Sequence, residues 1–170
     1  PAASTDVAII QNLDSRDAVL PATPAFDNTD PLTYSASTST TVYDTLGNSH
    51  VLDVFYRKTS ASPNTYEVYS ALDGTSTLAS HGTLEFNSTG ELTAPVSGDI
   101  PIPAVTLTNG ADPLNLTVGL GATTQFGTDF AVSSITQDGY GAGQLIAFEF
   151  DETGVAFARF TNGQSRAIGQ

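Results

Sequence analysis

The segment Leu114-Asn115-Leu116-Thr117-Val118-Gly119-Leu120 alternates apolar and polar or small residues without interruption. A period of two places all the apolar side chains on one face of a β-strand, as in a half-buried antiparallel sheet. Similar runs occur at 52–57, 66–68 and 146–150, and in none of them do apolar residues recur with the 3.6-residue period of a helix. The sequence therefore predicts an all-β protein with little or no helix, either an antiparallel β-sandwich or a partly closed β-barrel built from hairpins.

Three short segments share the order aromatic, Asp or Asn, two residues, glycine. They are 43–47, 86–90 and 150–154. An Asp or Asn at the first turn position accepts backbone hydrogen bonds, and a glycine at the last position adopts a positive φ without steric cost. These segments predict three hairpin turns, with the turn residues Asp44, Gly47, Asn87, Gly90, Asp151 and Gly154.

The ends of the chain differ from the middle. Residues 1–35 contain Pro21, Pro24 and Pro31 and little periodicity beyond a possible strand at 7–10, so they predict an extended, loop-like arm. The densest glycine cluster predicts a hinge or domain edge at Gly139, Tyr140, Gly141 and Gly143. We expect a β domain over 1–140 and a C-terminal β-hairpin within 141–170, either packed on the first domain or part of an adjacent one.

Composition excludes several classes of function. Among 170 residues there are 5 Lys and Arg and 18 Asp and Glu, which gives a formal net charge of −13. Nucleic-acid binding and attraction to anionic membranes both need cations, so neither kind of partner is expected. The absence of cysteine excludes disulfides, thiolate nucleophiles and Cys-ligated metals. No apolar run approaches the roughly 20 residues that span a bilayer as a helix.

Candidate chemical groups are few, and each has a simpler structural interpretation. Asp151 and Glu152 fall in a predicted turn, and Asp27 and Asp30 in the arm. His50 precedes a strand, close to Asp44 and Ser49 only in sequence, and His81 lies in a loop; no G-x-S-x-G elbow accompanies either histidine. We therefore expect no catalytic, cofactor-binding or metal site.

Several blocks resemble the bacterial flagellar hook proteins. Residues 41–50, TVYDTLGNSH, are similar to a signature of that family, and the strand at 51–59 follows it as expected. In the same order come four further matching blocks, at 65–69, 84–90, 136–143 and 150–170. Residues 1–40 match only through a "TDPxxY" element at 29–34, and residues 93–135 depart most from the family pattern.

The resemblance implies a structural fragment rather than an enzyme. It would be the outer β domain of a hook subunit together with the start of the returning inner-domain hairpin, without the terminal helices through which the family polymerises. It implies other hook subunits as partners, together with the hook-cap and hook–filament junction proteins, and an extracellular location reached through the flagellar type III export apparatus. The isolated fragment would be monomeric.

Two other classes of function remain open from the residues. One is an extracellular β-module for adhesion or carbohydrate binding, which would use exposed aromatics from among the six tyrosines, although the chain contains no Trp. The other is a hydrolase with two acidic residues, which would require a perturbed carboxylate in a concave pocket.

Overall fold

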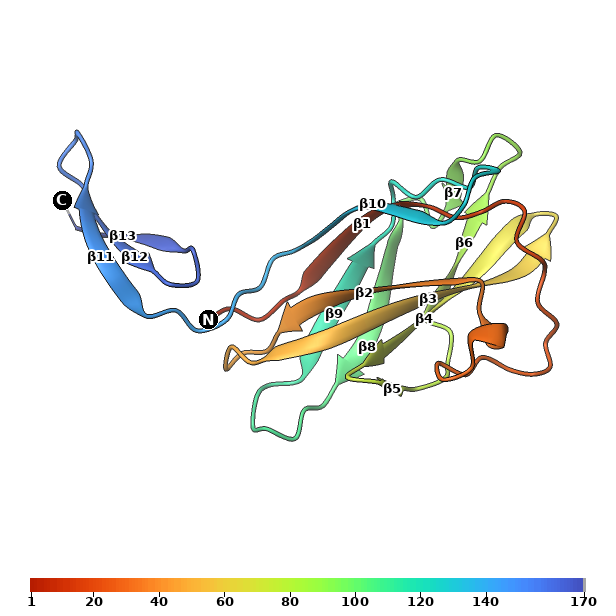
Figure 1. Ribbon diagram of the computed structural model, residues 1–170, viewed down its shortest axis with the longest axis horizontal. Coiled ribbons are helices and arrows are strands. Elements are labelled where there is room, and N and C mark those ends of the chain that lie inside the picture. Colours follow the sequence, from red (N-terminus) through yellow and green to blue (C-terminus); the bar gives the residue numbers. More distant parts are fainter. Residues whose placement is uncertain (170) are drawn as a thin grey trace.

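The computed structural model describes residues 1–169, which form a large β domain and a separate small C-terminal sheet (Figure 1). The domain contains ten strands and one 3₁₀ turn. These elements are β1 (Asp6–Asn12), η1 (Pro31–Thr33), β2 (Ala36–Tyr43), β3 (Ser49–Ala61), β4 (Asn64–Leu72), β5 (Thr75–Ser76), β6 (Gly82–Phe86), β7 (Leu92–Ala94), β8 (Asp99–Val105), β9 (Leu114–Gly119) and β10 (Ala131–Gln137).

The strands of the domain form two sheets packed face to face. One sheet has the order β2-β3-β4-β6-β7, with β5 paired to β4, and the other has the order β10-β1-β9-β8. All pairings are antiparallel except that of β1 with β9, which is parallel. The predicted antiparallel-rich, all-β sandwich is confirmed, as is the near absence of helix.

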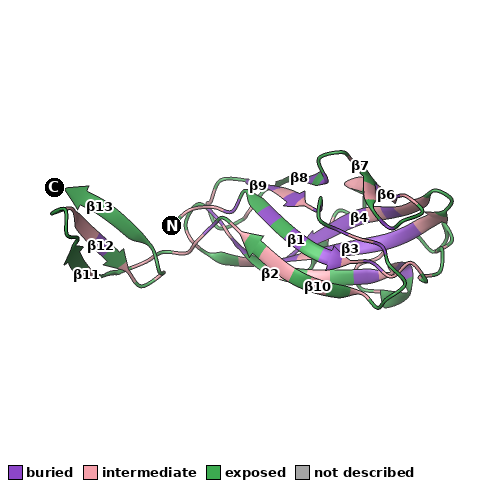
Figure 2. Cartoon of the chain, turned by 90° about the horizontal axis from the view of Figure 1, so that it is seen from above, coloured by how far each residue is buried: buried purple, intermediate pink, exposed green. Residues whose placement is uncertain are grey.

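The core lies between the two sheets, and Figure 2 shows buried positions on strands of both layers. Leu114, Leu116 and Val118 of β9 are almost fully buried, and they face the buried side chains of Leu52 and Tyr56 of β3. The alternation in β9 therefore corresponds to one core face and one solvent face. Each such large apolar side chain contributes about 1.5–3 kcal/mol of transfer free energy when it is buried.

The N-terminal segment differs from the loop-like arm expected for residues 1–35. Strand β1 is an inner strand of its sheet, and Val7, Ile9 and Leu13 belong to the main core. The following residues cross one end of the sandwich and cover the outer face of the β3–β4 sheet. There Phe26 stacks on Tyr69, with ring centroids 4.0 Å apart, and meets the edge of Phe55 at 5.3 Å.

Two buried cations hold this covering segment against the sheet. Lys58 donates to the carbonyl oxygens of Ser15 and Asp17 at 2.8 and 2.9 Å, and Arg57 donates to the carbonyl oxygens of Pro21, Pro24 and Thr33. Both side chains are only 3% exposed. Alternate residues of β3 point to opposite faces, so the neighbouring cations fix the segment from both sides of the sheet.

Two edge strands complete the sheet that contains β1 and β9. The Pro-containing segment at 99–105 is the edge strand β8, and edge strands tolerate proline because alternate N–H groups point away from the partner strand. The other is β10, which pairs with β1 along its length.

The C-terminal segment is a three-stranded antiparallel sheet rather than a single hairpin. Its strands are β11 (Leu145–Phe150), β12 (Ala156–Phe160) and β13 (Ser165–Gly169), and in the described chain none of them pairs with a strand of the large domain. Ile146, Phe148 and Phe150 are 63%, 58% and 76% exposed, so the β11 alternation produces an open apolar face instead of a core. Gln170, the last residue of the 141–170 segment, lies outside the described residues.

Candidate functional site

The three turns singled out in the sequence have the same backbone geometry. In each, the Oδ1 atom of Asp44, Asn87 or Asp151 accepts the N–H groups two and four residues later, at 2.8–3.0 Å. The glycine three residues after each of them donates its N–H back to the carbonyl of the first residue and has a φ of +81° to +87°. The side chain thus replaces part of the hydrogen bonding that a continuous strand would provide.

The turn that begins at Asp44 differs from the other two in its burial. The Asp44 side chain is fully buried, whereas Asp151 is exposed and Asn87 is intermediate. Its Oδ2 atom accepts from Asn48 Nδ2 at 2.9 Å and Asn109 Nδ2 at 2.6 Å, and lies 3.2 Å from His50 Nε2. Burial alone would raise the pKa of Asp44, but these donors outweigh it and hold the pKa well below its usual value.

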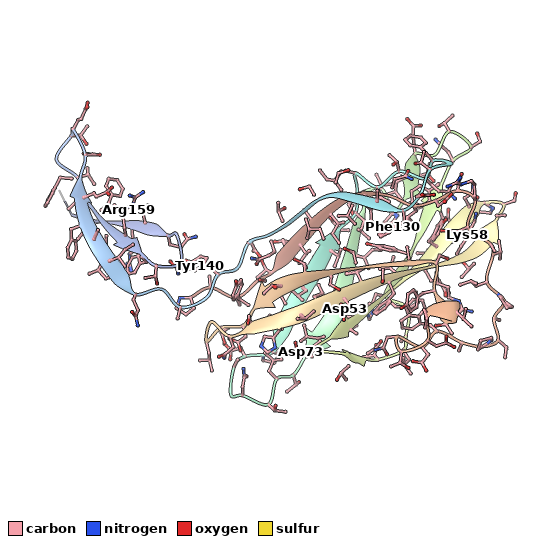
Figure 3. The ribbon with its side chains drawn as sticks, viewed as in Figure 1. Asp53, Lys58, Asp73, Phe130, Tyr140 and Arg159 are labelled. Atoms are coloured by element: carbon pink, nitrogen blue, oxygen red, sulfur yellow. The ribbon has the colours of Figure 1, made fainter. Side chains whose placement is uncertain are left out.

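This buried turn contacts the N-terminal residues 1–5 and the segment after β10, which leads to the C-terminal sheet. Ser4 donates its N–H to the carbonyl of Tyr43, and its hydroxyl accepts the N–H of Tyr43 at 3.0 Å. Ala2 and Tyr140 exchange both backbone hydrogen bonds at 2.9 Å, so residues 1–5 and 137–141 run side by side. Figure 3 shows Tyr140 on this connection, at the opposite end of the domain from Lys58.

The glycines of the expected hinge are closely packed. A Cβ on Gly139 would lie 2.3 Å from Ser4 Oγ, and one on Gly143 would lie 2.5 Å from Asn162 Cγ. Gly141 lies against Gly47 and the Tyr43 ring, and its carbonyl accepts Asn162 Nδ2 at 2.9 Å. We call this assembly of residues 1–5, 43–48 and 137–143 the junction. Whether the chain bends at the junction remains a prediction.

The remaining sequence candidates do not converge on a catalytic arrangement. Asp151 and Glu152 are exposed in their turn. Asp27 Oδ1 accepts both the N–H and the hydroxyl of Thr29 in the loop before η1. His81 Nε2 bonds the hydroxyl of Ser70 at 2.8 Å beside an apolar cavity of about 210 Å³, and burial lowers the pKa of His81. Within residues 1–169, no three His, Asp or Glu side chains are grouped so that they could hold a metal ion.

One group of side chains was missed by sequence reasoning. Asp44 and His50, which seemed close only along the chain, are in contact, and the second ring nitrogen of His50 lies 2.7 Å from Asp73 Oδ2. Asp73 and Asn109 come from distant loops, so no local pattern signals the cluster.

None of the helical structure in residues 1–169 is long and apolar enough to cross a membrane.

Comparisons with known proteins agree with the fold. Residues 12–140 match the family model described as the flagellar basal body protein FlaE D2 domain. The flagellar hook protein FlgE of Escherichia coli K12 is 30% identical over 174 residues, covering 99% of this chain and 42% of that protein. FlgE of Rhizobium meliloti is 32% identical over 136 residues, covering 76% of this chain and 32% of that protein.

A solved structure supports the same conclusion about the fold. The crystal structure of Helicobacter pylori flagellar hook protein FlgE2 has a TM-score of 0.53 and 19% identity, covering 81% of this chain and 32% of that one. The chain therefore spans well under half the length of these relatives. Because the family model accounts for the sandwich from the last residue of β1 to the junction, the chain belongs to the flagellar basal body protein FlaE D2 domain family.

Proposed function

We propose that this chain is part of a structural subunit of the bacterial flagellar hook and has no catalytic role. The observation that supports this most directly is the family match over residues 12–140, together with hook proteins that align with 99% of the chain. The hook is an extracellular part of the flagellum, so this function places the chain outside the cell and relates it to motility.

The subunit acts by self-association with its neighbours and transmits motor torque through a flexible joint. The geometry suited to this role is a stable sandwich whose two connections leave side by side at the junction. Interfaces that must break and re-form as a tube bends are small and polar rather than large and apolar. The scarcity of Arg and the absence of Trp agree with such weak contacts, since both residue types are enriched among the hot spots of strong interfaces.

The small C-terminal sheet belongs, in this proposal, to an adjacent inner domain of the subunit. Its exposed apolar face of Ile146, Phe148 and Phe150 supports the assignment, because soluble domains rarely leave a large apolar patch uncovered. The subunit is exported through the flagellar type III apparatus and meets the hook-cap and hook–filament junction proteins. This chain alone is monomeric, and a stable oligomer in sedimentation at micromolar concentration would contradict that.

The function can be tested by removing the sandwich from the full-length subunit. Thr5 donates its N–H to Asp138 Oδ1 at 2.8 Å, so a short Gly-Ser linker can replace residues 6–137 while leaving both connections in place. In the bacterium that carries the gene, we expect this deletion to abolish hooks or to reduce swimming speed strongly. Normal hooks and parental swimming would refute the proposal. The deleted gene is expressed from a plasmid, and the same plasmid with the undeleted gene is the control.

A further inference from the structure

His50, the first histidine of the chain and the second residue of β3, lies between two carboxylates. Its Nδ1 atom lies 2.7 Å from Asp73 Oδ2 and its Nε2 atom 3.2 Å from Asp44 Oδ2. An ionised carboxylate can only accept hydrogen bonds, so both ring nitrogens must carry a proton for both contacts to be hydrogen bonds. The arrangement therefore selects the imidazolium form.

The groups around His50 come from three separate loops. Asp44 lies in the 44–48 turn, Asp73 in the β4–β5 turn, and Asn109 in the 106–113 loop, where its Nδ2 donates to Asp44. A hollow of about 350 Å³ beside the ring is lined by His50, Asp73, Leu72, Thr75 and residues 105–109, none of which adds another ionisable group. The 106–113 loop contains one acidic residue, Asp112. Its side chain is exposed, and its backbone N–H donates to Thr45 Oγ1 at 3.1 Å.

The electrostatic balance at His50 agrees with this geometry. Burial alone would lower the pKa of His50, but the hydrogen-bonded carboxylates of Asp73 and Asp44 more than offset it and raise the pKa above 6.5. For Asp73, burial opposes ionisation, and the contact with His50 and the Val51 N–H outweigh it, which lowers the pKa of Asp73. The two carboxylates and one imidazolium thus form a single charge-assisted network.

We propose that His50 is a pH-dependent latch whose imidazolium ties the buried 44–48 turn of the junction to the β4–β5 turn, and whose deprotonation releases the β4–β5 turn. A neutral imidazole has one N–H and can keep only one of the two hydrogen bonds. Among the described residues, Asp44 keeps four other donors, whereas Asp73 keeps only the Val51 N–H at 2.8 Å. The β4–β5 turn is therefore the weaker partner, because its carboxylate keeps fewer donors than that of Asp44.

The latch predicts a definite sign for the effect of pH. A group whose pKa is higher in the folded than in the unfolded state contributes stability that is complete below the unfolded value. The contribution of His50 is therefore complete below pH 6.5 and is lost as the pH rises through its higher folded pKa. Residues 137–143, which we call the linker, contact the 44–48 turn at Gly141. The latch therefore connects the β4–β5 turn to the junction.

Nuclear magnetic resonance of the 170-residue chain tests the latch, and the chain provides its own control. His50 and His81 are its two histidines, and burial shifts the pKa of His81 in the opposite direction. In a titration from about pH 5 to pH 9, we expect the His50 ring to titrate above 6.5 and the His81 ring below it. Over the same range, hydrogen-exchange protection of the Asp73 amide, corrected for intrinsic rates, should fall severalfold.

Two variants separate the latch from a general loss of stability. In His50→Gln, protection of the Asp73 amide should be low and independent of pH, whereas His81→Gln should keep the parental pH dependence. Asp73→Asn should move the His50 titration toward lower pH. The proposal is overturned if the His50 ring titrates at or below 6.5, or if the Asp73 amide shows the same pH dependence with and without the His50 side chain.

Discussion

Substitution of Gly47 by alanine tests whether the buried turn positions the linker. A Cβ at this residue would lie 2.7 Å from Pro1 Cβ and 2.8 Å from Ala142 N, and the residue has a φ of +87°. The left-handed backbone costs an L-residue roughly 1–2 kcal/mol. Overpacking against backbone atoms that cannot rotate away adds about 1–3 kcal/mol. We therefore expect Gly47→Ala to cost about 2–5 kcal/mol and to displace the linker.

Gly110 provides the matched control for this substitution. Its φ of +86° is nearly the same, but no atom of residues 1–169 lies within 4 Å of a Cβ placed there. Gly110→Ala should therefore cost only the backbone penalty of roughly 1–2 kcal/mol. The difference between the two variants isolates the steric contact with the linker from the conformational cost of replacing a glycine.

Two measurements are needed, one for stability and one for geometry. Urea unfolding gives the free-energy difference between each variant and the parent. The chain contains no cysteine, so spin labels on Thr41→Cys and Glu152→Cys report the distance between the β domain and the C-terminal sheet without background. Gly47→Ala should shift or broaden this distance distribution, and Gly110→Ala should not. If both variants lose the same stability and leave the distribution unchanged, the turn does not position the linker.

Further predictions concern buried polar groups, acid stability and the sheet edge. Asp44→Ala should destabilise the domain by roughly 2–4 kcal/mol in urea unfolding, because it leaves buried donors unsatisfied, whereas Asn87→Ala should cost about 1 kcal/mol; equal losses would contradict the role of burial. Lys58→Met should cost about 2–3 kcal/mol by leaving the carbonyls of Ser15 and Asp17 without their donor, and an unchanged unfolding midpoint would contradict that. Because the pKa of Asp44 is lowered from 3.8, its contribution to stability is present above pH 3.8 and lost as the pH falls through the folded value, which acid unfolding of parent and Asp44→Asn can compare. Replacing Pro101 and Pro103 together by threonine should restore N–H groups on the edge strand β8 and increase aggregation measured by light scattering, while unchanged scattering would count against a protective role.

Sequence periodicity predicted the fold class because the sandwich core is built from alternating strands. The pattern at 114–120 needs only one buried face, and the structure provides it. Periodicity failed where partners from elsewhere in the chain decide the outcome. β8 contains prolines that are tolerated only at an edge. The segment at 15–33 is held by Lys58 and Arg57 through backbone carbonyls, which no sequence pattern encodes.

The candidate site was predictable to a similar extent. The Asp-x-x-Gly spacing predicts a local turn, since all its hydrogen bonds lie within five residues. Sequence could not distinguish the buried Asp44 turn from the exposed Asp151 turn, because the difference comes from Asn109 and His50 on one side and the linker on the other. The cluster of His50 with Asp73 depends on the register of β3 against β4, which local patterns do not determine.

The most direct test of the central claim is cryo-electron microscopy of hooks purified from the bacterium that carries this gene. The account predicts that the sandwich of residues 6–137 fits the hook density as one body, with residues 1–5 and 137–143 leaving it side by side toward the inner part of the tube. It also predicts that the apolar face of β11 is covered by another part of the subunit. Hook density that cannot accommodate the sandwich, or that separates the two connecting segments, would contradict the account.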